Sequence, residues 1–165
     1  MERRNAWLSY EEADEKELEQ VAKAYRNFLN VGKTERECVT QIIREARAAG
    51  YESLEEKTAK GEKLKAGDKV YTVGMKKIIA LFHIGQDDIS EGMHILGGHI
   101  DSPRLDVKQN PLYEDTDLAY LDTHYYGGVK KYQWVTLPLA IHGVVVKKDG
   151  STAEVNIGED EDDPI

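Results

Sequence analysis

The chain has 165 residues, of which 40% are hydrophobic and 32% charged, which is typical of one soluble domain of ordinary size. Its formal net charge of −9 argues against nucleic acid and anionic membrane as main partners, because both are negatively charged. Cys38 is the single cysteine, which excludes an internal disulfide and a cysteine-based zinc cluster. The polar start lacks the apolar core of a signal peptide, and no apolar run could cross a bilayer, so we expect a cytoplasmic protein.

Two amphipathic helices are expected first. Ser9 and Glu12 have the spacing of a capping box, and an apolar stripe at helical spacing follows them. Thr34 and Glu37 repeat the capping signal ahead of a second stripe, which Gly50 is well placed to end.

Strands are expected after the helices. Residues 52–68 are charged and show little periodicity, and we interpret them as a loop. Strand patterns over residues 70–73 and 77–84 flank Gly74 and predict a hairpin. Further extended segments are predicted at residues 103–109, 118–126, 132–137, 139–146 and 152–157, with a turn at Lys148-Asp149-Gly150.

The pattern changes near Asp106, from mixed helix and strand before it to strands alone after it. The acidic run that begins after Gly158 is followed by Pro164 and Ile165, where an apolar segment is expected to start. We therefore expect the chain to continue in its parent protein.

His99 and Asp101 are the strongest candidates for chemistry. They are two residues apart, next to Gly97-Gly98 and after the short apolar run 93–96, so in an extended chain their side chains point to the same side. An imidazole can bind zinc through one ring nitrogen while the other donates to a carboxylate. The pair alone is weak evidence, and a surface histidine bonded to a nearby acid is the simpler interpretation.

A longer string carries more information than the pair. Gly97-Gly-His-Ile-Asp-Ser-Pro-Arg104 resembles the first metal-binding motif of the aspartyl aminopeptidase and aminopeptidase I family of zinc metalloaminopeptidases. The resemblance to bacterial members continues in order through residues 110–114, 123–128, 130–134, 137–145 and 157–160 and includes the early helices. It therefore covers essentially the whole chain.

The resemblance implies a fold and an activity. Members are exopeptidases with two zinc ions that remove the amino-terminal residue from peptides. The implied fold class is α/β: residues 1–106 would be the amino-terminal part of an incomplete α/β-sandwich catalytic domain, and residues 107–165 the beginning of an inserted β-rich dimerisation domain. His99 would be a direct zinc ligand, and Asp101 would orient it without binding the metal itself. Members form homo-oligomers, as dimers and larger tetrahedral particles.

The departure from the family pattern is the length, since members continue well beyond Ile165. Their other zinc ligands and the glutamate that acts as general base lie in that later part. A catalytic zinc normally needs three protein ligands, so we expect the chain alone to be inactive. The alternative is a non-catalytic fragment or paralogue that serves as a binding or assembly module, and a related metal-dependent deacylase is a third possibility. The preferred amino-terminal residue cannot be deduced from this sequence.

Structural roles are expected for the other histidines. His83, His94 and His142 are interpreted as strand residues. His124, with the tyrosines at 125 and 126, is expected in an aromatic cluster on a sheet surface, with a substrate pocket or subunit contact as the alternative.

Two further side chains have simple interpretations. Cys38 is expected to be a buried, inert thiol on the second helix. Arg104 is expected either to orient a carboxylate or to form a structural ion pair.

Overall fold

A computed structural model describes residues 5–160 of the chain and divides it into two compact units, Met1–Gly98 and His99–Ile165. Residues 161–165, on which the expected continuation of the chain depends, and the polar start at residues 1–4 lie outside the described residues. None of the helices within residues 5–160 combines the length and the apolar character that a membrane span requires.

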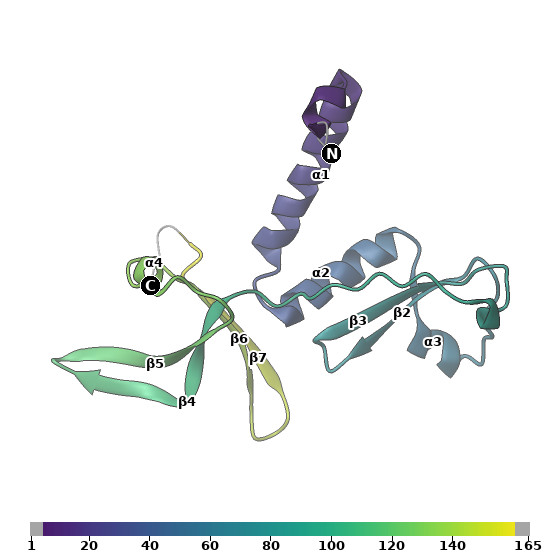
Figure 1. Cartoon of the computed structure of the whole chain (residues 1–165). Coiled ribbons are helices and arrows are strands. Elements are labelled where there is room, and N and C mark those ends of the chain that lie inside the picture. Colours follow the sequence, from purple (N-terminus) through teal and green to yellow (C-terminus); the bar gives the residue numbers. More distant parts are fainter. Residues whose placement is uncertain (1–4, 161–165) are drawn as a thin grey trace. The chain divides into compact units, whose positions relative to one another are not determined.

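The first unit combines helices with a three-stranded sheet (Figure 1). In the sheet, β2 lies between β1, which is parallel to it, and β3, which is antiparallel. The elements in chain order are the 3₁₀ helix η1 (Ala6–Ser9), α1 (Glu12–Val31), α2 (Glu35–Ala48), β1 (Glu52–Ser53), α3 (Leu54–Ala59), β2 (Lys69–Gly74), β3 (Ile78–His83) and the 3₁₀ helix η2 (Ile89–Glu91). The predicted hairpin around Gly74 is confirmed as β2 and β3.

The start of α1 differs from the prediction, whereas the start of α2 agrees with it. The Ser9 hydroxyl donates to a carbonyl within η1, and the capping box is formed two residues further on by Glu11 and Asp14. At α2 the predicted box is present: the Thr34 amide donates to the Glu37 carboxylate at 2.8 Å, and the Glu37 amide donates back at 3.4 Å. The Ser9 signal was wrong because that side chain is used by a tighter local turn.

Gly50 ends α2 as predicted. Its φ of +86° is in the left-handed region that favours glycine. The Gly50 amide donates to the Arg47 carbonyl and the Tyr51 amide donates to the Ala46 carbonyl, the paired bonds of a Schellman motif. The chain is thereby turned out of the helix towards β1.

The segment expected to be a loop, residues 52–68, contains β1 and α3. Both elements are too short to produce visible periodicity, at two and six residues. Ser53 caps α3 by accepting the Glu56 amide at 3.3 Å. The Lys57 ammonium on α3 lies 2.7 Å from the Glu52 carboxylate and 3.3 Å from that of Glu62, which ties the helix to its flanking chain.

The core of the first unit lies where α2 packs on β2 and β3 (Figure 1). Its buried apolar residues are Cys38, Val39 and Ala46 of α2 and Val70 and Tyr71 of β2. Cys38 is buried as expected. Burial is the largest cause of a raised pKa of its thiol, and the nearby carboxylates of Glu37 and Glu35 on α2 raise it further.

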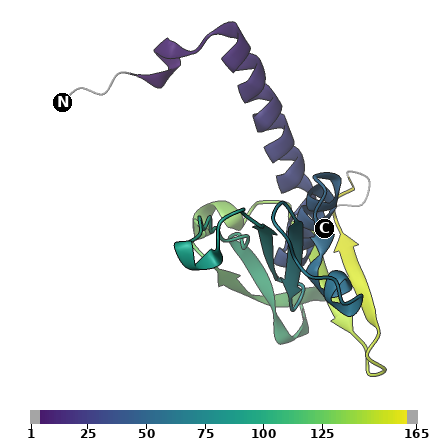
Figure 2. The same ribbon diagram turned by 90° about the vertical axis from the view of Figure 1, so that its right-hand side faces the viewer.

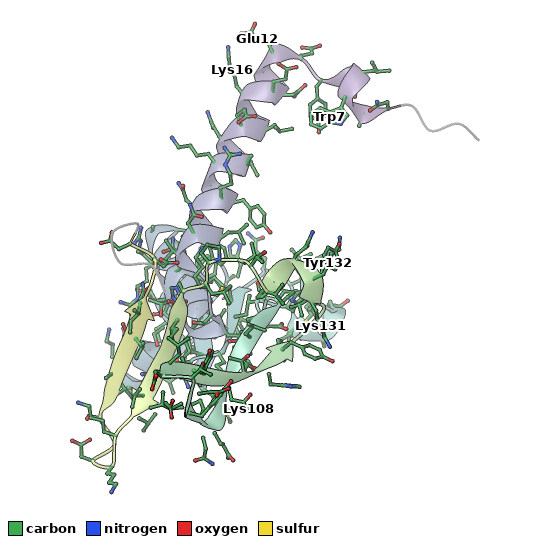
Figure 3. The ribbon with its side chains drawn as sticks, turned by 90° about the vertical axis from the view of Figure 1, so that its left-hand side faces the viewer. Trp7, Glu12, Lys16, Lys108, Lys131 and Tyr132 are labelled. Atoms are coloured by element: carbon green, nitrogen blue, oxygen red, sulfur yellow. The ribbon has the colours of Figure 1, made fainter. Side chains whose placement is uncertain are left out.

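Helix α1 contributes no buried residue, although its predicted apolar stripe is present. Val21 is 63% exposed and Tyr25 61% exposed. Figure 2 shows α1 extending away from the sheet of its own unit. On its surface Lys16 pairs with Glu12 at 2.6 Å, and both side chains are labelled in Figure 3.

The second unit consists of two antiparallel hairpins and a short helix. The elements are β4 (Arg104–Asp115), β5 (Leu118–Tyr126), α4 (Lys131–Trp134), β6 (Ile141–Val146) and β7 (Thr152–Ile157). The predicted turn between β6 and β7 is confirmed, with Gly150 at a φ of +83° (Figure 2). Together, helices and strands make a mixed α and β structure.

Two strand predictions in or next to the second unit are wrong. Residues 131–134 form α4, whose labelled residues Lys131 and Tyr132 appear in Figure 3. Aromatic residues favour strands only where a neighbouring strand can pair with them. Residues 92–103 contain no strand, and Leu96 within them is 100% exposed. A strand needs a neighbouring strand for its amides and carbonyls, and none of the strands within residues 5–160 pairs with this segment.

Candidate metal-binding site

His99 and Asp101 form a local pair at the start of the second unit. The His99 Nδ1 atom lies 3.2 Å from the Asp101 Oδ1 atom and 3.0 Å from the Asp101 backbone carbonyl oxygen. The His99 side chain is 84% exposed and that of Asp101 35% exposed. The two side chains thus point to one side, as their spacing predicts, although no strand holds them.

The partners of Nδ1 determine which ring nitrogen carries the proton. A carbonyl oxygen and an ionised carboxylate only accept hydrogen bonds, so the neutral ring is favoured with its proton on Nδ1. The lone pair of His99 is then on Nε2, at the end of the ring that is free to meet a metal ion. Zinc-binding histidines have this arrangement, with a carboxylate or carbonyl on the second nitrogen.

Asp101 is held from its other side by Tyr126. The Tyr126 hydroxyl donates to the Asp101 Oδ2 atom at 3.0 Å. This bond is the largest cause of a lowered pKa of the Asp101 carboxyl, followed by its backbone amide and, to a smaller extent, His99. The carboxylate is therefore ionised at neutral pH, with one oxygen directed to each partner.

Arg104 joins the same cluster from β4. Its guanidinium carbon lies 4.1 Å from the centre of the Tyr126 ring, and its Nε atom donates to the Asp106 Oδ1 atom at 2.7 Å. Arg104 and Tyr126 face each other in the β4–β5 register. Of the two expectations for Arg104, the structural ion pair is the one observed.

A glycine brings the end of β5 close to the chain that precedes β4. Gly127 has a φ of +71°, and a Cβ added there would lie 3.4 Å from the Cα atom of Pro103. This close approach keeps Tyr126 within reach of Asp101.

The remaining histidines lie on strands or, in one case, outside regular structure. His83 is on β3 as predicted but is exposed, and His94 lies in the irregular segment, where a strand was expected. His142 is on β6, with its Nε2 atom 3.2 Å from the Glu159 carboxylate. The ring of His124 lies 5.1 Å from that of Tyr125, so the expected aromatic cluster on β5 is confirmed.

The cluster contains one side chain of a type that commonly binds zinc, with a carboxylate beside one of its ring nitrogens. Among residues 5–160 there is no group of three His, Cys, Asp or Glu side chains that could hold a metal ion. The donor set fits a single position of a zinc site, with a histidine nitrogen as ligand and a carboxylate behind it.

Sequence reasoning found His99 and Asp101 but placed Tyr126 in an aromatic cluster, with a substrate pocket or subunit contact as the alternative, and did not link it to Asp101. A signal was available in the hairpin register, because pairing β4 with β5 places Tyr126 opposite Arg104, three residues after Asp101.

A histidine with a carboxylate beside one ring nitrogen is typical of metal-binding proteins, and the comparisons with known proteins find a family of zinc metalloproteases. Residues 28–165 match the family described as aminopeptidase I zinc metalloprotease (M18). A probable M18 family aminopeptidase 1 of Clostridium acetobutylicum is 57% identical over 99% of this chain, which covers 35% of that protein. A related protein of Thermotoga maritima is 43% identical over 100% of the chain, again covering 35% of its own length.

Solved structures give the same result. The crystal structure of aminopeptidase I from Borrelia burgdorferi B31 matches with a TM-score of 0.90 and 38% identity, over 98% of this chain and 39% of that one. The chain therefore belongs to the M18 family of aminopeptidase I zinc metalloproteases. It spans about a third of the length of the curated relatives it matches.

Proposed function

We propose that this chain supplies the first zinc-ligand segment of a zinc-dependent aminopeptidase, an enzyme that removes the amino-terminal residue from peptides. The observation that carries the proposal is the His99–Asp101 pair, in which Nδ1 is bonded to the aspartate and Nε2 is left for a metal. Membership of the M18 family supports it.

In this proposal His99 binds zinc through Nε2, and Asp101 fixes the tautomer and direction of the ring. Zinc held there would supply Lewis-acid chemistry: it would polarise the scissile carbonyl and lower the pKa of the attacking water. Asp101 also makes the histidine a more basic ligand, because its negative charge stabilises the proton on Nδ1. No residue of this chain is assigned as the general base.

The domain assignment belongs to the same proposal. Residues 1–106 are the amino-terminal part of an α/β-sandwich catalytic domain, and residues 107–165 begin a β-rich dimerisation domain. The exposed apolar side chains at the tip of the β4–β5 hairpin, Leu112 at 72% and Leu118 at 57%, support an assembly role for that part. Peptide substrates, two zinc ions per complete site, a homo-oligomer and a cytoplasmic location complete the proposal.

A chimera tests the function directly. The segment of the C. acetobutylicum relative that aligns with this chain is replaced by residues 1–165, and zinc content and amino acid release from short peptides are measured. We expect an active, zinc-containing enzyme, because the remaining ligands and the base come from the relative. His99→Ala should lower kcat/KM by more than about 100-fold, beyond the usual cost of losing an outer partner.

His94→Ala is the matched control, since this exposed histidine lies on the same segment outside the cluster and should leave activity unchanged. The 165-residue chain alone should show no peptidase activity, because one assigned ligand does not complete a catalytic site. A chimera that folds but contains no zinc and cleaves no peptide would contradict the enzyme proposal and favour the alternative of a non-catalytic binding or assembly module.

A further inference from the structure

Asp101 lies in a segment that no strand fixes, so some other contact must set the direction of its carboxylate. It lies three residues before the start of β4, and the chain from residue 92 to residue 103 has no regular structure. A side chain on such a segment samples several rotamers unless a partner selects one. The partner that the structure provides is the Tyr126 hydroxyl, 3.0 Å from Oδ2.

Tyr126 is itself held on the sheet. It is the last residue of β5 and pairs with Arg104 of β4 in the strand register. The Arg104 guanidinium covers its ring at 4.1 Å and is fixed in turn by the Asp106 carboxylate at 2.7 Å. The hydroxyl therefore has a defined position relative to β4, which the irregular segment lacks.

The two carboxylate oxygens of Asp101 are divided between two partners. Oδ2 accepts from Tyr126, while Oδ1 faces His99 Nδ1 at 3.2 Å. Rotation of the carboxylate that shortened the contact of one oxygen would lengthen that of the other. The position of the Tyr126 hydroxyl therefore determines where the Asp101 Oδ1 atom lies relative to His99 Nδ1.

We propose that Tyr126 is a positioning residue that acts through Asp101 to keep the proton of His99 on Nδ1 and its Nε2 directed to the metal. The inference rests on the proposed function of His99 as a zinc ligand. It adds a third member to the pair, from the end of β5 and 25 residues along the chain from Asp101.

Tyr125 provides a matched control one position away. Successive side chains of a strand point to opposite faces, and the Tyr125 ring contacts Lys131 at 4.4 Å and His124 at 5.1 Å. Tyr125→Phe therefore removes a hydroxyl from the same strand without touching Asp101, whereas Tyr126→Phe keeps the ring under Arg104 and removes only the donor to Asp101.

The test measures the tautomer of His99 in the metal-free 165-residue chain, by the chemical shifts of its two ring nitrogens at neutral pH. We expect Tyr126→Phe to raise the population with the proton on Nε2 by roughly threefold, less than the 10–100-fold effects of losing a direct partner of a ligand. Tyr125→Phe should leave it unchanged. In an Asp101→Asn background Tyr126→Phe should have no further effect, because the tyrosine acts only through that carboxylate.

An unchanged tautomer in Tyr126→Phe, or an equal shift with and without the Asp101 carboxylate, would overturn the inference in favour of a packing role. The amide signals of β4 and β5 show whether the variant keeps its hairpin. If it does not, the contact between Tyr126 and Asp101 is tested by changing the aspartate instead. Asp101→Asn should shift the ring Cζ signal of Tyr126 and leave that of Tyr125 unchanged. The absence of a shift at Tyr126 would also overturn the inference.

The outcome is separable from that of the proposed function. If His99→Ala abolishes the activity of the chimera while Tyr126→Phe leaves the tautomer unchanged, only the positioning role fails. If Tyr126→Phe shifts the tautomer while His99→Ala leaves the activity of the chimera intact, the proposed role of His99 as a zinc ligand fails and the contact remains a structural one.

Discussion

The interactions that stabilise the first compact unit differ from those that stabilise the second. Within residues 5–160, every buried residue belongs to the first unit, where α2 packs on the sheet. The second unit has its strands in two separate hairpins. The strands within a hairpin are joined by backbone hydrogen bonds, and in β4–β5 also by polar and aromatic contacts. An isolated two-stranded hairpin is marginally stable in water. The candidate site therefore lies in the unit with less apolar burial, and its geometry depends on specific polar contacts.

The largest expected effect comes from the core of the first unit. Val70 is fully buried at 0% exposure, whereas Val146 in the second unit is 67% exposed. Val70→Ala should lower the free energy of unfolding of the first unit by about 2–3 kcal/mol, because it removes buried methyl groups and leaves a cavity. Val146→Ala should change stability by less than about 0.5 kcal/mol. Amide hydrogen exchange, resolved by residue, measures the stability change in both variants. Similar losses of stability in Val70→Ala and Val146→Ala would contradict the proposed difference between the two units.

Gly50 in the first unit and Gly150 in the second are a matched pair for comparing the units. Both have a positive φ, and a Cβ added at either would meet no atom within 4 Å. Gly50→Ala should destabilise α2 and Gly150→Ala the β6–β7 hairpin, each by about 1–2 kcal/mol, the cost of a left-handed backbone for an L-residue. Each loss should be confined to its own unit in hydrogen exchange. Asn tolerates this conformation better, so the Asn variants should recover part of the loss; equal effects of Ala and Asn would refute the conformational explanation.

A pH-dependent contribution of Glu52 is expected in the first unit. Hydrogen bonding to Lys57 lowers the pKa of Glu52 below its ordinary value of 4.5. A carboxyl whose pKa is lowered by folding stabilises the fold above its unfolded pKa, and this contribution is lost as pH falls through the folded pKa. The urea midpoint of the first unit should therefore fall as pH is lowered below about 4.5.

Lys57→Met should make that pH dependence shallower, because the cation that favours the ionised form is gone. Lys63→Met, at an exposed position in the following loop, is the control and should follow the unaltered chain. Parallel pH curves for the Lys57→Met variant and the unaltered chain would exclude Lys57 as the cause.

The smallest effect is expected on the exposed surface of α1. Lys16 and Glu12 are 70% and 83% exposed in their side chains. Lys16→Ala should change the free energy of unfolding by no more than about 0.5 kcal/mol, the usual size of an exposed ion pair four residues apart on a helix. Urea unfolding followed by circular dichroism measures it, and a loss above about 1 kcal/mol would show that α1 contributes more than its surface position indicates.

The sequence predicted those features whose cause is local. The Thr34–Glu37 capping box, the left-handed Gly50 and the turn at Gly150 each depend on a few neighbouring residues, and all three are present. Two strand predictions were wrong because no strand is available as a partner or another local structure forms: the apolar run before His99 pairs with no strand among the described residues, and residues 131–134 form a helix.

The candidate site also combines a contact that depends on local sequence with one that depends on a distant residue. The approach of His99 to Asp101 follows from a spacing of two residues and was predicted. The bond from Tyr126 joins residues 25 apart and depends on the β4–β5 register, on Arg104 and on the close approach at Gly127. No local pattern contains that information, although the register of the hairpin does.

The link between Asp101 and Tyr126 also sets an order of events during folding. His99 and Asp101 can meet as soon as both have been synthesised, but the tyrosine that holds them arrives only when β5 closes on β4. Hairpin closure takes roughly 1–10 μs once both strands exist, far less than the time to add one residue during synthesis. On a ribosome, the orientation of the His99 ring would thus become fixed only once Tyr126 has been synthesised and β5 can pair with β4.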